Sequence, residues 1–181
     1  MRIVAGEFRG RRLKSPTWEG LRPTSDRLRE TLFNILGPSI RGARVLDGYA
    51  GSGAIGIEAL SRGAAHVTFV ENDGRAVKLI EANLALLGAG AGAKPAIIRA
   101  GLADAATRLS GQVFDLIILD PPYADTAAAM ALDAAGTLAG RETRVIVEHA
   151  SRYAAPAEQA GCRLTRTVKA GDSALSFYEH H

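Results

Sequence analysis

The stretch VLDGYAGSGAIGIEAL, residues 45–60, decides the fold, because it reads as a strand, a glycine-rich turn and a helix in direct succession. Gly51, Gly53 and Gly56 have the spacing G-x-G-x-x-G of dinucleotide-binding turns. Glycines at such positions let the backbone turn tightly and approach a ligand at a helix N-terminus. The pattern therefore predicts a Rossmann-like α/β fold with a ligand loop after its first strand.

On either side of this stretch, apolar runs of strand length alternate with segments of helical periodicity. This order predicts a mostly parallel sheet that is covered on both faces by helices. After residue 160, two further β-rich runs joined through Gly171 and Asp172 predict a closing antiparallel hairpin, which makes seven strands. The predicted strands are 43–47, 66–71, 95–99, 113–119, 143–148 and the two runs within 162–179, and the predicted helices are 53–62, 73–87, 102–110 and 124–139.

The N-terminal part of the chain precedes the alternating region and differs from it in character. Residues 1–23 predict a short hairpin followed by a loop, and a helix then begins with Thr24 or Ser25 as its cap and Asp26 in its first turn. The Gly-Pro-Ser sequence at 37–39 predicts the end of this helix. We divide the chain into a small extension, 1–24, and a main domain, 25–181. Leu28, Leu32, Ile35 and Leu36 share one face of the predicted helix.

Length and composition indicate one folded domain with an ordinary core: 181 residues, 47% hydrophobic and 23% charged. The sequence contains neither an apolar run of the roughly 20 residues that span a bilayer nor a secretory signal. The single cysteine, Cys162, excludes an internal disulfide. We therefore expect a cytoplasmic protein, with a monomer as the default state.

Positive charge is concentrated at the N-terminus. Residues 1–30 carry eight Lys or Arg against four acids, whereas the remaining 151 residues sum to −1, for a total of +3. Such a basic segment favours a polyanionic partner, usually nucleic acid, although charge alone fits a solvated terminal strand and helix equally well. The basic residues expected to face a nucleic acid are Arg2, Arg9, Arg11, Arg12, Lys14 and Arg22.

Asp47, the last residue of the first predicted strand, distinguishes between two classes of ligand for the glycine loop. A pyrophosphate is anionic and gains nothing from a carboxylate beside the loop. S-adenosylmethionine has no phosphate and carries an ammonium and a sulfonium group, so a nearby acid favours it. Glu71 ends the next strand, 20 residues after Gly51, and can accept both ribose hydroxyls in either class. Asp73 is expected to cap the helix that follows.

The sequence LDPPY, residues 119–123, ends the buried run that precedes it. Proline donates no backbone hydrogen bond and stops a sheet ladder, so Asp120 and Tyr123 are presented at a rigid edge. An exocyclic base amine is a poor nucleophile because its lone pair is conjugated into the ring. The Asp120 carboxylate and the Pro121 carbonyl can bind the amine hydrogens, and Tyr123 can stack on a base. The motif predicts methyl transfer by positioning and electrostatics.

The chain resembles the RsmD family, bacterial methyltransferases that modify a guanine N2 in 16S ribosomal RNA. The resemblance rests on MRIVAGEFRGRRLKSP, RPTSDRLRETLFNIL, GSGAIGIEALSRGA, DPPY and GDSALSFYE, which occur in the family's order over nearly the whole length. It implies a class I methyltransferase fold, S-adenosylmethionine as donor and the assembled or assembling small subunit as substrate. The chain departs from the family at two positions: Gly48 stands where the family usually has a bulky apolar residue, and Gly101 stands where many members have Asp or Asn to meet the adenine amine. Because Gly101 has no side chain for that contact, Asp104 or backbone groups would contact the adenine.

The resemblance also implies roles for individual residues. Asp120, Pro121, Pro122 and Tyr123 would hold the guanine, and Arg22, Pro23 and Thr24 would border both the donor and the RNA path. The full set expected at the donor is Arg22, Thr24, Asp47, Tyr49, Ala50, Gly51, Ser52, Gly53, Glu71, Asn72, Gly101, Leu102 and Asp120.

Three other functions stay open at the level of sequence. A DNA adenine-N6 methyltransferase would use the same Asp-Pro-Pro-Tyr, although 181 residues leave no separate region of DNA-recognition size. An RNA-binding assembly factor would need no intact Asp47, Glu71 and Asp120. An NAD oxidoreductase is disfavoured by Asp47. The histidines and the cysteine have no spacing typical of a metal site.

Overall fold

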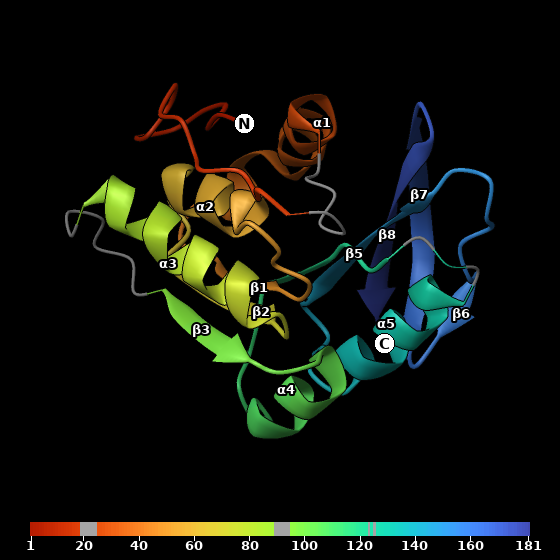
Figure 1. The fold of residues 1–181 in the computed structure, drawn as a ribbon. Coiled ribbons are helices and arrows are strands. Elements are labelled where there is room, and N and C mark those ends of the chain that lie inside the picture. Colours follow the sequence, from red (N-terminus) through yellow and green to blue (C-terminus); the bar gives the residue numbers. More distant parts are fainter. Residues whose placement is uncertain (19–24, 89–94, 123, 125) are drawn as a thin grey trace. The chain divides into compact units, whose positions relative to one another are not determined.

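The computed structural model describes residues 1–18, 25–88, 95–122, 124 and 126–181. Within it the chain forms two compact units, Met1–Ala100 and Gly101–His181 (Figure 1). Each unit contains its own helices and strands and is described separately below.

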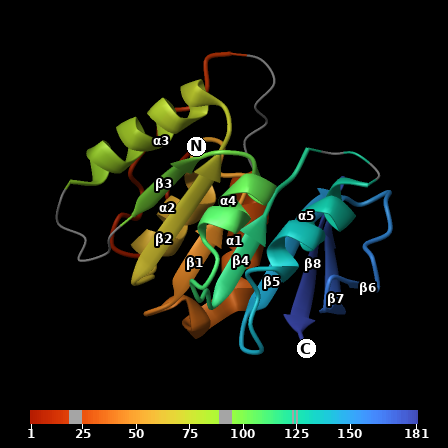
Figure 2. The same ribbon diagram turned by 90° about the horizontal axis from the view of Figure 1, so that it is seen from below.

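The first unit contains three parallel strands in the order β3-β2-β1. They are β1 (Arg44–Asp47), β2 (His66–Glu71) and β3 (Ala96–Arg99), which run side by side in Figure 2. In the register of β1 with β2, Asp47 pairs with Phe69, so both strands end at the same edge of the sheet. This edge carries Asp47 at the end of β1 and Glu71 at the end of β2.

Helices of the first unit follow the predicted order. Helix α1 (Asp26–Leu36) begins at Ser25, whose side chain accepts the Leu28 N–H at 3.1 Å, and continues into a 3₁₀ helix, η1 (Gly37–Ile40). Helix α2 (Ala54–Ser61) is buried along its whole length, and α3 (Gly74–Leu87) is amphipathic. Both pack on β2, and the adjacent position of α2 and α3 is visible in Figure 1.

The predicted N-terminal hairpin is confirmed for residues 1–13. Arg2 and Arg12 form an antiparallel bridge, and the Leu13 N–H donates to the Met1 carbonyl at 3.2 Å. We call residues 1–14 the arm; three of its apolar side chains are buried against the rest of the unit, whereas its cations stay exposed. The buried side chains are Ile3, Phe8 and Leu13.

The second unit combines parallel and antiparallel pairing in the strand order β4-β5-β8-β7-β6. Strands β4 (Leu116–Leu119) and β5 (Arg144–Ala150) are parallel, whereas β8 (Ser173–His180) pairs antiparallel with both β5 and β7 (Cys162–Ala170). Helices α4 (Leu102–Arg108) and α5 (Ala127–Gly136) complete the unit. The predicted closing hairpin through Gly171 and Asp172 is confirmed.

The second unit differs from the prediction in several bounds: β5 is Arg144–Ala150 and not 143–148, α4 ends at Arg108 and not at 110, and the following details also differ. A two-residue strand, β6 (Glu158–Gln159), pairs with β7 and adds an eighth strand among the described residues. Strand β4 begins at Leu116 and not at 113, because Val113 is 68% exposed and lies outside the buried run. Helix α5 is shorter than the predicted 124–139: it begins after its N-cap, Thr126, whose side chain makes no capping hydrogen bond. The predicted domain boundary after residue 24 stays a prediction.

Candidate active site

The glycine loop between β1 and α2 contains two residues in left-handed conformations. Gly51 has a φ of +54° and Gly53, the N-cap of α2, has a φ of +79°. A side chain would be strained at either position, and a Cβ on Gly53 would also meet Ile80 of α3 at 3.3 Å. The Gly53 N–H donates to the Ala50 carbonyl at 2.7 Å, which closes the turn. Glycine is therefore needed here for the conformation that the sequence pattern predicts.

Asp47 lies beneath this loop and is 1% exposed. Its Oδ2 accepts the Gly56 N–H at 2.9 Å, so the carboxylate satisfies one of the donors in the first turn of α2. Burial raises the pKa of Asp47 to about 7, the hydrogen bond from Gly56 opposes that rise, and the negative charge of Glu71 adds to it. Asp47 is thus a buried acid that changes protonation near neutral pH, beside the loop proposed to bind a cation.

Glu71 braces the loop from the neighbouring strand. Its Oε2 accepts the Gly51 N–H and its Oε1 accepts the Asp73 N–H, both at 2.8 Å. The carboxylate is half-buried, so it is also accessible from one side. Asp73 is the N-cap of α3 and accepts the Arg75 N–H at 2.8 Å, so the predicted capping role of Asp73 is confirmed.

The other predicted donor residues of the first unit lie in or next to the same loop. Tyr49 is half-buried, and burial raises the pKa of its hydroxyl. The Ala50 N–H donates to the Val70 carbonyl at 3.0 Å, which ties the loop to β2. Ser52 is buried and Asn72 is exposed. The structure thus brings together, at one edge of one sheet, the donor residues that were predicted between Asp47 and Asn72.

The second unit carries the Asp-Pro-Pro sequence directly after β4, as predicted. Asp120 is half-buried, Pro121 is buried, and Pro122 is exposed with its carbonyl accepting the Ala124 N–H at 2.8 Å. Gly101 is the N-cap of α4 in an extended conformation, and Leu102 is the first residue of that helix. The predicted residues Arg22, Pro23, Thr24 and Tyr123 lie outside the described residues.

The arm presents the predicted cations on its surface. Arg11 donates to the Leu87 carbonyl at the end of α3 at 3.1 Å and lies over the Phe8 ring at 5.1 Å. The structure describes residues 1–18 of the N-terminal segment. The residues in this range that were predicted to face a nucleic acid are all exposed. These are Arg2, Arg9, Arg11, Arg12 and Lys14.

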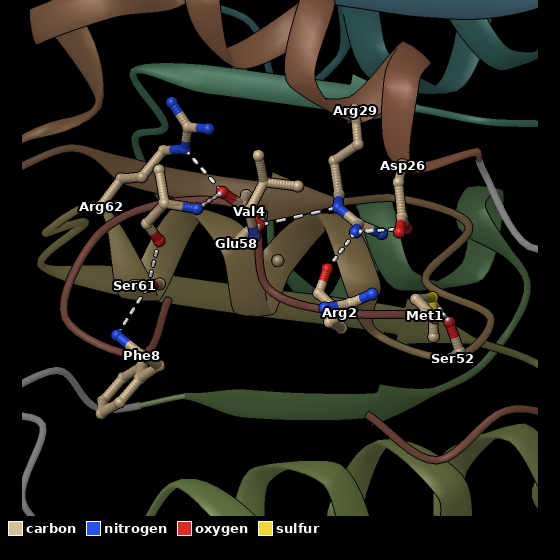
Figure 3. Close-up of polar contacts among 12 residues, drawn as sticks. Met1, Arg2, Val4, Phe8, Asp26, Arg29, Ser52, Glu58, Ser61 and Arg62 are labelled. Atoms are coloured by element: carbon tan, nitrogen blue, oxygen red, sulfur yellow. Dashed lines mark hydrogen bonds and ion pairs between the residues drawn. The ribbon is translucent and has the colours of Figure 1, made fainter. Parts of the chain in front are cut away.

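A buried ionic cluster that the sequence did not reveal holds the arm on α1 and α2 (Figure 3). Glu58 accepts the Val4 N–H at 2.8 Å and the Ala5 N–H at 3.0 Å, and it pairs with Arg62 at 2.8 Å. Arg29, also fully buried, lies 3.7 Å from Glu58 and donates to the Arg2 carbonyl. Glu58 interrupts the apolar sequence of α2, whereas Arg29 lies among other charged residues of α1 and gives no such signal.

Candidate metal ligands and catalytic histidines do not gather among the residues that the structure describes. No group of three or more His, Cys, Asp or Glu side chains placed to hold a metal occurs in them. His149 is buried and bonds the Ser176 hydroxyl at 2.8 Å, and burial lowers the pKa of His66. No described helix is long and apolar enough to cross a membrane.

Comparison with known proteins gives matches over the full length of the chain. The family described as "Conserved hypothetical protein 95" matches residues 1–179. "Ribosomal RNA small subunit methyltransferase D" of Escherichia coli strain K12 is 39% identical over 182 residues, which cover 99% of this chain and 89% of that protein. The solved structure of "Putative methyltransferase yhhF" from Escherichia coli has a TM-score of 0.83 at 36% identity and covers 100% of this chain and 98% of its own.

A more distant structure agrees in fold alone. The rRNA methyltransferase aviRa from Streptomyces viridochromogenes has a TM-score of 0.70 at 16% identity, with 90% of this chain and 88% of that chain covered. The order of strands and helices and the glycine loop after β1 are those of a class I methyltransferase. The chain belongs to the RsmD family of methyltransferases, which confirms the resemblance that its motifs indicated.

Proposed function

We propose that this protein transfers a methyl group from S-adenosylmethionine to the exocyclic N2 of a guanine in 16S ribosomal RNA, within the assembled or assembling small subunit. The observation that carries the proposal is the pair of carboxylates, Asp47 and Glu71, bonded to the backbone of the glycine loop. Asp47 beside the loop favours a cationic donor over a pyrophosphate, and Glu71 can accept the ribose hydroxyls of that donor. Family membership adds the substrate, since the relative from Escherichia coli is named for small-subunit ribosomal RNA.

In the proposed donor site, Glu71 accepts hydrogen bonds from the ribose hydroxyls. Each of its oxygens already accepts one backbone N–H and has a further lone pair for this purpose. Asp47 acts on the ammonium end of the donor through its negative charge, from beneath the loop. Tyr49, Ala50, Ser52 and Asn72 line the same loop and strand end. Gly101 and Leu102 contribute backbone groups toward the adenine. The family resemblance assigns Arg22 and Thr24 to the border of the donor as well.

In the proposed acceptor site, the Asp120 carboxylate and the Pro121 carbonyl accept the two hydrogens of the guanine amine. These bonds favour the pyramidal nitrogen whose lone pair attacks the methyl carbon. As the new N–C bond forms, the C–S bond breaks, its electrons pass to sulfur, and the sulfonium becomes a neutral thioether. The methylated nitrogen is then cationic and acidic, so it releases a proton to solvent water and no strong general base is required. Tyr123 stacks on the guanine, and Pro122 fixes the turn.

In the proposed complex, the exposed cations of the arm contact the RNA phosphates. Protein and RNA of the subunit supply most of the recognition, because the arm offers little surface of its own. The proposed substrate places the enzyme in the bacterial cytoplasm, as a monomer that acts on one subunit at a time.

The test is a transfer assay with methyl-labelled S-adenosylmethionine and three acceptors in parallel: small subunits from a strain that lacks guanine-N2 methylation at the target, naked 16S ribosomal RNA and duplex DNA. Label in the subunits and none in DNA supports the proposal. Label in DNA would replace it with an adenine-N6 activity. Donor binding without label in any acceptor would replace it with a non-catalytic role in subunit assembly.

A further inference from the structure

A buried asparagine on α3 joins the arm to the glycine loop. Asn83 is fully buried, and its side-chain Nδ2 donates to the Ser52 carbonyl at 3.0 Å and to the Lys14 carbonyl at 3.1 Å. Its Oδ1 accepts the Lys14 N–H at 2.7 Å. One amide therefore contacts the end of the arm and the middle of the proposed donor loop, two segments that lie far apart in sequence.

The bonding capacity of this amide makes the two contacts interdependent. An asparagine side chain has one N–H₂ group with two hydrogens and one carbonyl oxygen. Asn83 donates one hydrogen to the Lys14 carbonyl and the other to the Ser52 carbonyl, and its oxygen accepts the Lys14 N–H. A displacement of the arm would turn the amide, and the bond to Ser52 would then lose its geometry. Because the site is buried, water does not readily replace that bond.

Asn83 contacts the glycine loop at the peptide group between Ser52 and Gly53. The Ser52 carbonyl belongs to the peptide whose N–H, on Gly53, donates to the Ala50 carbonyl at 2.7 Å. Asn83 thus fixes one side of the same peptide group that closes the glycine turn on the other side. Ser52 also contacts the arm directly, since its hydroxyl lies 3.7 Å from the Met1 sulfur.

We propose that Asn83 is a positioning residue that couples the two binding events, so that RNA bound to the arm strengthens donor binding at the loop and the donor strengthens RNA binding by the same factor. This inference rests on the proposed function. It goes beyond that function because it assigns communication between the two sites to one side chain that contacts neither ligand.

The arm does not depend on Asn83 to stay folded. Glu58 and Ser61 hold its first turn through the N–H groups of Val4, Ala5 and Phe8, at 2.8 to 3.0 Å. These bonds and the buried apolar side chains of the arm remain when Asn83 is changed. A variant at position 83 can therefore lose the coupling while it keeps both sites.

The experiment measures the affinity for S-adenosylhomocysteine, which has no methyl group to transfer, with and without saturating small subunits from the strain described above. The ratio of the two affinities is the coupling factor. We expect about tenfold for the unaltered protein, within the usual range of such couplings. For the isosteric Asn83→Asp, which keeps only the bond from Lys14, we expect a factor near one. Asn83→Ala is the second variant, and thermal unfolding verifies that each is folded.

Two controls separate coupling from binding and from stability. Lys14→Ala removes the charge but keeps the backbone groups that Asn83 contacts, so we expect weaker subunit binding with the coupling factor unchanged. Asn34→Ala changes an exposed asparagine on α1 and should alter neither quantity.

The outcomes distinguish the inference from the function on which it rests. A coupling factor of one in the unaltered protein, or an unchanged factor in folded Asn83 variants, overturns the inference and leaves the proposed function intact. Absence of both donor and subunit binding in the unaltered protein overturns the two together. A merely structural role for Asn83 would lower the unfolding temperature and leave the factor near tenfold.

Discussion

Burial raises the pKa of Asp47, and this single residue should therefore make the stability of the fold depend on pH. Its pKa is about 7 in the fold and about 3.8 in an unfolded chain. The folded protein without donor thus binds more protons, and stability is lost as the pH rises between these values. The full shift is an upper bound of about 4 kcal/mol.

Asp47→Asn can still accept the Gly56 N–H but has no carboxyl to titrate, so we expect the loss of folding stability with rising pH to disappear in this variant. The variant should unfold several degrees above the unaltered protein at pH 8 and no higher than it at pH 4. Thermal unfolding from pH 4 to 8 without donor measures the difference. Parallel curves for the two proteins would show that Asp47 does not titrate in this range.

Glu71 gives a second prediction at the residue scale, since its carboxylate holds two backbone N–H groups in the loop and strand end. Glu71→Gln leaves one acceptor oxygen and places an amide donor against the other N–H. We expect at least a tenfold loss of S-adenosylmethionine affinity, measured by calorimetry, in a protein that stays folded. Glu81→Gln, at an exposed acid on α3, is the control. Equal affinity in both variants would remove Glu71 from the donor site.

At the scale of elements, the close packing of α2 on β2 depends on a glycine. A Cβ on Gly56 would come within 2.2 Å of the Phe69 ring and 2.9 Å of Val67. We expect Gly56→Ala to destabilise the protein by about 1–3 kcal/mol, because a filled core accepts an extra methyl group only by distortion. Gly101→Ala is the matched control, since its Cβ would meet nothing within 4 Å at an ordinary φ. Urea unfolding compares the two, and equal midpoints would contradict the packing described here.

The sequence predicted the regular elements well where local patterns determine them. Strand β2 was predicted at its observed bounds, because an apolar run is flanked there by a polar cap sequence. The two-residue β6 was missed, since so short a strand exists only through its pairing with β7. The ends of α5 were misplaced because alanine favours a helix without marking where it stops.

The site was predictable in its residue types but not in its connections. The glycine spacing and the acids at strand ends indicated Asp47 and Glu71, whereas the bond from Gly56 to Asp47 depends on how α2 turns back over β1. Glu58 and Asn83 went unnoticed although each interrupts an apolar helical face. Their partners, in the arm, are more than 50 residues away in sequence, and no local pattern shows such pairs.

At the scale of the molecule, charge is divided between the two units. Met1–Ala100 has 15 Lys or Arg and nine acids, a net +6, whereas Gly101–His181 has seven and ten, a net −3. We expect binding of small subunits to weaken steeply with salt. The variant with Arg9→Gln and Arg12→Gln should reduce the slope of log Kd against log salt by about 1.5, near the value for two phosphate contacts.

The control for this slope is Arg141→Gln, at an exposed arginine of the second unit. Filter binding over a range of potassium chloride concentrations measures all three proteins. An unchanged slope in the double variant, or an equal reduction in the control, would contradict a role for the arm in RNA contact.

The central claim is that the Asp-Pro-Pro-Tyr sequence directs methyl transfer to the N2 of guanine. The most direct measurement is nucleoside mass spectrometry of 16S ribosomal RNA from subunits treated with S-adenosylmethionine and either the unaltered protein or Asp120→Ala, with donor affinity measured in both. We expect N2-methylguanosine with the unaltered protein and none with the variant, while donor affinity stays within a few-fold. A different methylated nucleoside, or equal yields from the two proteins, would contradict the claim.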